Sequence, residues 1–126
     1  MWKDDAYLLE MLEAARRAAA FLEGRDEPGF YADSLLQHGV MMLLVVIGET
    51  AHKVSKEFQD AHPEVPWRLM YGIRNVLVHA YGQVRLDRVW HAAHVGVPAL
   101  IRDLELLIPP DDGAEPPSQL TPRETP

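Results

Sequence analysis

The first apolar pattern along the chain predicts a helix over residues 4–23. Apolar side chains recur at the one-, three- and four-residue steps of a single helix face: Tyr7, Leu8, Met11, Leu12, Ala15, Ala19 and Leu22. The segment "EGRDEPG" (23–29) follows, and its two glycines and one proline predict that the helix ends there.

A second helix is predicted to start at Asp33 or Ser34 and to run to about Phe58. Both residues are favourable N-caps, and Gln37 stands three residues after Ser34 as in a capping box. Its middle, "VMMLLVVIGE", is apolar on every side, which is typical of a helix buried all round. Either this is the central helix of the bundle, or part of it contacts a second subunit. We favour the second interpretation.

Two further helices complete the pattern. Pro66 suits the first turn of a helix from Trp67 to about His79, which Gly82 ends. Asp87 can cap a fourth helix whose apolar positions continue to residue 107. Pro98 lies inside that helix and cannot donate to a backbone carbonyl, so a kink is expected near residue 96. These elements predict an all-α fold, an antiparallel bundle of four to five helices over residues 1–108.

The tail and the overall charge narrow the function classes. Residues 109–126 are proline-rich and polar, and we expect them to be flexible. They contain four acidic residues and one arginine, so −3 of the net charge of −7 lies there and −4 in the body. An acidic body argues against a protein that coats nucleic acid, although a local basic site can still bind RNA as a substrate.

Other features of the composition concern location. The chain has no cysteine, which excludes disulfides and thiolate metal sites and fits a reducing cytoplasm. No signal peptide is visible, and the longest apolar run, Val40 to Ile47, is far shorter than a membrane span. We therefore expect a cytoplasmic protein that does not bind membranes.

The segment "RNVLVHAY" (74–81) concentrates the candidate chemistry. Asn75 and His79 are four residues apart and share a helix face, with Arg74 beside them and Tyr81 just beyond. Arginine matches phosphate oxygens, and histidine can exchange a proton near neutral pH. This set suits phosphodiester cleavage without a metal, and RNA supplies its own 2′-hydroxyl nucleophile. Structural roles as a helix cap and a surface ion pair are the alternative.

The stoichiometry of this segment also bears on assembly. Such a cleavage uses an acid and a base, whereas the segment contains one histidine. A two-fold dimer with the segment near its axis would supply two. This agrees with a second helix that contacts another subunit.

With this motif, the sequence resembles the HEPN superfamily, specifically its HepT-like branch. "RNVLVHAY" fits the R-x4-H-x-Y signature, and the resemblance extends over "VIGETAHKVSKEF", "HPEVPWRLMYGIRNVLVHAY", "VRLDRVW" and "VPAL" in that order. It implies a homodimeric, metal-independent endoribonuclease toxin without a cofactor, whose site forms at the dimer interface. It further implies that an MntA-type nucleotidyltransferase antitoxin neutralises the toxin by transferring AMP to Tyr81. By position, Arg74 and His79 are catalytic and Asn75 supports them.

Two questions stay open at this level. Glu49, directly after the apolar run, either orients Arg74 or His79 or is an ordinary solvated residue. The alternative interpretation of the domain is a non-catalytic nucleotide- or RNA-binding module that partners a nucleotidyltransferase. His91 and His94 are three residues apart but have no third ligand at a diagnostic spacing, so no metal site is predicted.

Overall fold

The computed structural model describes residues 2–108, so the tail predicted for residues 109–126 lies outside the described residues. Within this range the chain is helical and forms no strand, which confirms the all-α prediction. The elements are α1 (Trp2–Leu22), α2 (Glu27–Tyr31), α3 (Ser34–Lys53), α4 (Lys56–Ala61), α5 (Trp67–His79), the 3₁₀ turn η1 (Tyr81–Gln83), α6 (Leu86–His91), the π-helical turn η2 (Ala92–Gly96) and α7 (Val97–Leu107).

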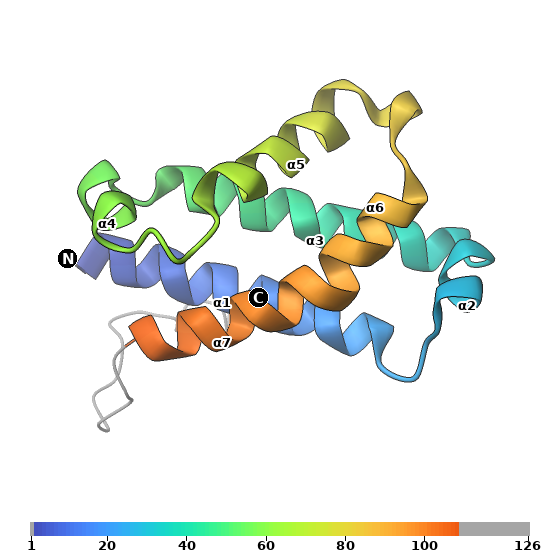
Figure 1. The fold of residues 1–126 in the computed structure, drawn as a ribbon, viewed down its shortest axis with the longest axis horizontal. Coiled ribbons are helices and arrows are strands. Elements are labelled where there is room, and N and C mark those ends of the chain that lie inside the picture. The colour runs from blue at the N-terminus through green and yellow to red at the C-terminus, as the bar shows by residue number, and fades with distance from the viewer. Residues whose placement is uncertain (1, 109–126) are drawn as a thin grey trace, which may run out of the picture.

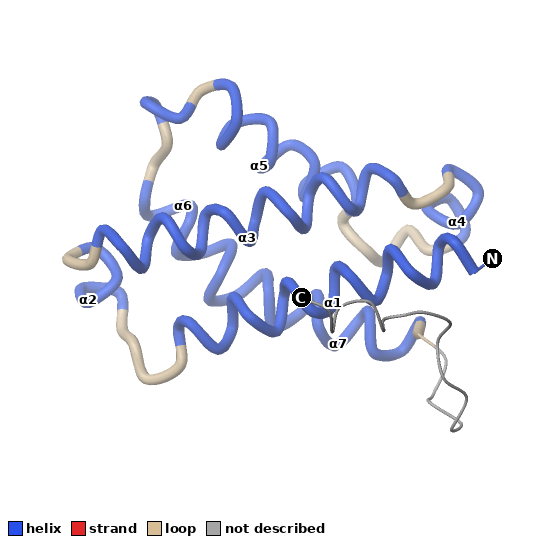
Figure 2. The backbone as a smooth tube through the Cα atoms, turned by 180° about the vertical axis from the view of Figure 1, so that it is seen from behind, coloured by secondary structure: helices blue, strands red, loops and turns tan. Residues whose placement is uncertain are grey.

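Helices α1 and α3 form the antiparallel centre of the bundle (Figure 1). Helix α5 packs against α3, whereas η2 and α7 pack against α1. The apolar face predicted for the first helix is the inner face of α1, where Leu8, Met11 and Ala15 are fully buried. The view from behind shows the same order, with α5 on the far side of α3 from α1 (Figure 2). The bundle therefore has two outer helices, each resting on a different central one.

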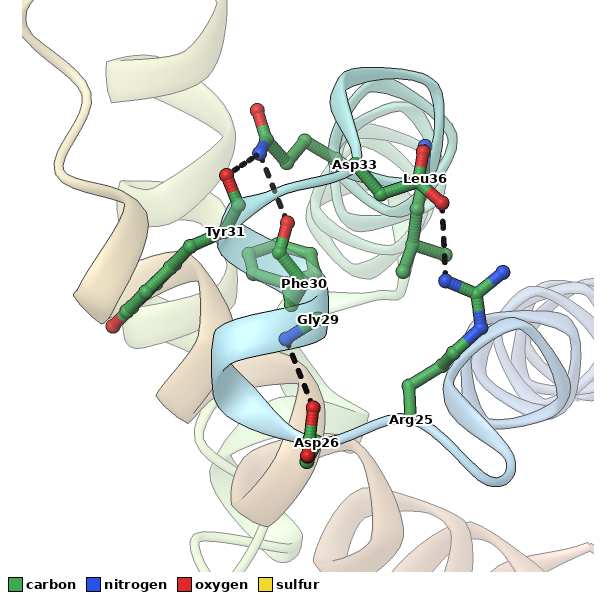
Figure 3. A network of polar contacts seen from close by, with 8 residues as sticks. Arg25, Asp26, Gly29, Phe30, Tyr31, Asp33 and Leu36 are labelled. Atoms are coloured by element: carbon green, nitrogen blue, oxygen red, sulfur yellow. Dashed lines mark hydrogen bonds and ion pairs between the residues drawn. The ribbon is translucent and has the colours of Figure 1, made fainter.

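The predicted break is confirmed, because α1 ends at Leu22, but the segment before α3 also contains the short helix α2, which the sequence does not predict. Asp26 caps it by accepting a hydrogen bond from the Gly29 N–H at 2.9 Å, and Pro28 occupies its first turn (Figure 3). Phe30 is fully buried. The proline that helps to end the first helix therefore also starts the next one.

The start of α3 also differs in detail from the capping box. Asp33 is the N-cap and accepts from the Leu36 N–H at 3.0 Å. The buried Gln37 amide instead donates to the backbone carbonyls of Phe30 and Tyr31, at 2.9 and 3.1 Å (Figure 3). Gln37 therefore satisfies the carbonyls at the end of α2 rather than the cap of its own helix.

Helix α3 ends at Lys53, earlier than the predicted end at Phe58. Val54 has extended backbone angles, and Ser55 caps α4 by accepting from the Phe58 N–H at 3.1 Å. Asp4 of α1, only 4% exposed, accepts from both the N–H and the hydroxyl of Ser55, at 2.9 and 2.7 Å. A contact across 51 residues thus fixes the corner between α3 and α4.

The last helix is interrupted where the sequence predicts. Pro98 has no N–H to donate, and the preceding turn, η2, is π-helical, with Val97 N–H donating to the Ala92 carbonyl. The predicted cap is wrong: Arg85 occupies the N-cap position of α6 without a side-chain cap. Asp87 lies in the first turn and pairs with Arg85 at 2.9 Å.

One face of α3 is not buried by its own chain. Leu36, Val40, Leu44 and Ile47 face the core, whereas Leu35 and Met42 are 84% and 61% exposed on the outer face. The role of a central helix therefore explains only the inner face, and contact with a second subunit stays a prediction. By length and composition α3 would also pass as a membrane span, as core helices do, and 56% of that window is buried here.

The Asp4–Ser55 contact gives the first testable prediction. Asp4→Ala removes a buried acceptor of two hydrogen bonds and is expected to lower the free energy of unfolding by about 1–3 kcal/mol. Chemical denaturation monitored by circular dichroism measures the change. Asp5→Ala, at the exposed neighbouring position, is the matched control. Equal stability of the two variants would show that this corner does not stabilise the bundle.

Candidate functional site

The backbones of α3 and α5 approach each other closely at Gly48, and this approach places Arg74. A β-carbon built at Gly48 would lie 2.5 Å from the Arg74 Cβ and 2.6 Å from the Met70 carbonyl oxygen. Only glycine leaves room for that contact. The base of the Arg74 side chain is therefore enclosed between two helices, and 19% of the side chain is exposed.

All three guanidinium nitrogens of Arg74 are bound within the chain. Nε and Nη2 donate to the same carboxylate oxygen of Glu49, at 2.9 and 2.6 Å. Nη1 donates to the side-chain oxygen of Asn75 at 2.8 Å. Glu49 is therefore not an ordinary solvated residue: it follows Gly48 directly and binds the guanidinium of Arg74. Asn75 contacts Arg74 and makes no hydrogen bond to His79 in the described part of the chain.

The Tyr71 ring packs against Arg74, and a second aromatic ring, that of His52, stacks on Tyr71. The guanidinium carbon lies 5.5 Å from the ring centre of Tyr71, within the range of cation–π attraction. The His52 ring stacks on Tyr71 with centroids 3.9 Å apart and planes at 9°. The sequence does not predict this contact, although Tyr71 stands three positions before Arg74, a spacing at which helix side chains meet.

The other two members of the motif lie at the exposed end of α5. His79 is the last residue of α5 and is exposed, and Tyr81 starts η1 with 46% of its side chain exposed. Within residues 2–108 no hydrogen bond or ring contact joins either of them to Arg74. A single chain therefore brings together Arg74, Asn75 and Glu49 but does not close the site around His79 and Tyr81.

A second histidine from α3 lies beside Tyr81. The rings of His38 and Tyr81 have centroids 5.9 Å apart. The Nδ1 atom of His38 is 2.7 Å from the Ser34 carbonyl oxygen, and because a carbonyl only accepts, Nδ1 carries the proton. This leaves Nε2 as the acceptor in the neutral ring. No local sequence signal links positions 38 and 81, which lie on different helices.

The arrangement has the groups that phosphate chemistry needs but no obvious metal site. An ordered arginine at a half-buried position suits a phosphate oxygen, and an exposed histidine near it suits proton transfer. No group of three or more histidine, aspartate or glutamate side chains within residues 2–108 is placed to hold a metal ion. The fold and these side chains together define an all-helical domain with an ordered arginine in the middle of α5 and an exposed histidine at its end.

The chain belongs to the HepT-like ribonuclease family: the family model described as "Ribonuclease HepT-like" matches residues 11–107. Similar proteins include "Putative RNase MJ1380" of Methanocaldococcus jannaschii, 28% identical over 81% of this chain and 94% of that protein. Another is "Probable ribonuclease HepT" of Thermococcus cleftensis, 31% identical over 83% of this chain and 90% of that protein. No solved structure matches. Ribonuclease activity is thus supported at the level of the family.

The close contact at Gly48 gives the second prediction. Gly48→Ala places a methyl group against Arg74 and the Met70 carbonyl and is expected to lower the free energy of unfolding by about 1–3 kcal/mol. Gly72→Ala on α5 is the matched control, because nothing lies within 4 Å of the added carbon there. Helix propensity should make that control more stable by up to about 1 kcal/mol. Thermal and urea unfolding compare the two, and a neutral Gly48→Ala would contradict the contact.

Proposed function

We propose that this protein is a metal-independent endoribonuclease toxin of a toxin–antitoxin pair. Its active site is completed at a homodimer interface, and a cognate MntA-type nucleotidyltransferase silences it by transferring AMP to Tyr81. The observation that carries the proposal is the Arg74 guanidinium, held by Glu49 and Asn75 on the same helix as the exposed His79, five residues before it. RNA and the nucleotidyltransferase are the proposed partners, in the cytoplasm.

The proposed reaction is attack by the RNA 2′-hydroxyl on the adjacent phosphorus. A cyclic phosphate forms, and the bond to the 5′-oxygen of the next nucleotide breaks. The Arg74 guanidinium stabilises the charge that develops on the phosphate oxygens, and His79 moves a proton. Because Glu49 and Asn75 already fix the guanidinium, binding the phosphate costs little additional side-chain ordering.

The need for a second group that transfers a proton supports a dimer. One chain places one histidine of the motif at the end of α5, whereas the reaction uses an acid and a base. The exposed apolar stripe of α3, with Leu35 and Met42, leads along the helix to Glu49 and so to Arg74. Association through this stripe would bring two copies of the motif together and would cover apolar surface.

The position of Tyr81 supports control by AMP transfer. Its side chain is 46% exposed on the three-residue turn that follows His79, so a transferase can reach the hydroxyl without unfolding the helix. The added phosphate brings negative charge and bulk next to the motif. It would repel the RNA phosphate and occupy its place.

A non-catalytic nucleotide- or RNA-binding module is the second candidate function. The hydrogen bonds at all three nitrogens of Arg74 favour this second function. They are expected for an arginine with a structural role as well as for an ordered catalytic arginine. Cleavage of RNA by the purified protein in the presence of a chelator separates the two functions. Binding without cleavage by unmodified protein would establish the module instead.

Substitutions in the motif give the third prediction. Arg74→Ala and His79→Ala are each expected to reduce RNA cleavage by about a hundredfold or more, because the first removes charge stabilisation and the second proton transfer. A fluorogenic RNA substrate measures the rate. His91→Ala, an exposed histidine on α6, is the matched control and should retain activity.

Assembly must be measured on the same samples. Sedimentation should show wild type and variants as dimers, and circular dichroism should show equal helix content. Undiminished cleavage by His79→Ala would remove the role assigned to it. A fully active monomer would contradict the composite site.

The acceptor hydroxyl gives the fourth prediction. Co-expression with the cognate nucleotidyltransferase should add the mass of AMP, or multiples of it, to the intact protein. Tyr81→Phe should abolish that increment, because it lacks the hydroxyl. Tyr31→Phe, an exposed tyrosine on α2, is the control and should be modified like the wild type. Intact mass spectrometry distinguishes these outcomes, and an increment that persists in Tyr81→Phe would place the acceptor elsewhere.

A further inference from the structure

We propose that the groove between α5 and the α6–α7 arm is a docking site for an acidic amphipathic helix of a partner protein. The groove is separate from the Arg74 site and concerns a different surface of α5. It is called the α5–α6 groove below, and its α5 wall is Leu69, Ile73 and Val76.

The groove follows from how the outer helices are supported. Helix α5 rests on α3, whereas η2 and α7 rest on α1, so the two arms stand apart with α3 beneath them (Figure 1). Two cavities of about 530 and 750 Å³ fill the space between them. They share Leu69, Ile73, Arg88 and Ala92 along their walls and therefore form one continuous groove. Leu44 and Ile47 of α3 line the deeper part.

The α5 wall is aliphatic, and the aromatic rings of Trp90 and His91 line only the larger cavity. Part of the apolar lining is open to solvent. Leu69 is 62% exposed, Val76 48% and Val95 49%. The smaller cavity has no aromatic lining, so it offers nothing for a nucleobase to stack on. Leucine and isoleucine side chains fit such walls, as in other grooves that accept the apolar face of a helix.

The rim selects the charge of the occupant. Arg68, Arg85 and Arg88 line the smaller cavity. Arg85 pairs with Asp87, but within residues 2–108 neither Arg68 nor Arg88 has an acidic partner within salt-bridge distance. Glu27 and Asp87 line the larger cavity, so the positive rim is confined to the smaller one. There two cations have no acidic partner among the described residues, in a chain whose net charge is −7. A helix with acidic flanks complements this rim, whereas a basic helix is repelled.

The dimensions set the length of the partner helix. The α5 wall belongs to a helix of 13 residues, which spans about 20 Å at 1.5 Å per residue. A partner helix of about three to four turns matches that length. It would present aliphatic residues at every third or fourth position and aspartate or glutamate beside them.

Selection from a display library of helical 16-residue peptides on the purified full chain tests the proposal. The enriched peptides should combine an aliphatic stripe with a net negative charge. Synthetic copies, measured by fluorescence anisotropy, should bind about tenfold or more weaker to Leu69→Glu and to Arg88→Glu. Leu106→Glu and Arg102→Glu are matched controls, because both side chains are exposed on α7 outside the groove, and they should bind like the wild type.

Four results would overturn the proposal. One is the absence of enrichment, and another is enrichment of basic peptides or of peptides that bind Leu69→Glu normally. A third is tight binding at the groove by a synthetic peptide of residues 109–126, which would make the chain's own tail the occupant. The fourth is loss of self-association in Leu69→Glu but not in Leu106→Glu, measured by sedimentation, which would make the groove an interface between copies.

Discussion

The contact between α3 and α5 at Gly48 is the constraint on which the site depends. Because this position has no side chain, the two helices meet at backbone distance, and the Arg74 stem lies against α3. The next residue, Glu49, is then within 2.6–2.9 Å of the guanidinium. A larger residue at position 48 would separate the helices and with them the arginine from its carboxylate. One missing β-carbon thus sets the geometry of charged groups that come from two helices.

The same contact gives Arg74 a different character from the other ion pairs of the surface. The Arg16–Glu105 and Lys56–Asp60 pairs join side chains that are about half exposed or more, where solvent screens the attraction. Arg74 is 19% exposed, packs on Tyr71 and is bound at every nitrogen. Its charge is therefore balanced at rest and held in one orientation. A phosphate that approaches has to exchange with the carboxylate of Glu49 or share the guanidinium with it.

The sequence predicted the elements that rest on local periodicity. The range of α5 and the irregular turn before Pro98 follow from spacing and from proline chemistry alone, and both are confirmed. The differences at α2, at the end of α3 and at Asp87 have one cause. In each case a side chain makes a hydrogen bond or ion pair that competes with the expected pattern, as Gln37 does with the carbonyls of α2. Periodicity does not register such bonds.

The candidate site was predictable to a similar extent. Its motif residues are adjacent in sequence, so Arg74, Asn75, His79 and Tyr81 were found together. Residues that reach the site from α3 are harder to predict from the sequence, because only tertiary packing brings them there. The sequence leaves two interpretations of Glu49 open and does not indicate that the His38 ring lies 5.9 Å from that of Tyr81. The packing of α3 against α5 decides both, and local periodicity predicts that packing only coarsely.

The place of Tyr81 has a consequence for how a chemical change there would be felt. Its ring lies on a three-residue turn outside the hydrophobic core, and nearly half of it is in contact with solvent. A group attached to that oxygen meets much the same water in the folded and the unfolded chain, so it alters the folding equilibrium little. The charge on the surface at this end of the molecule can therefore change with little change in the free energy of unfolding. A melting curve would hardly move, even though the attached group changes the local charge.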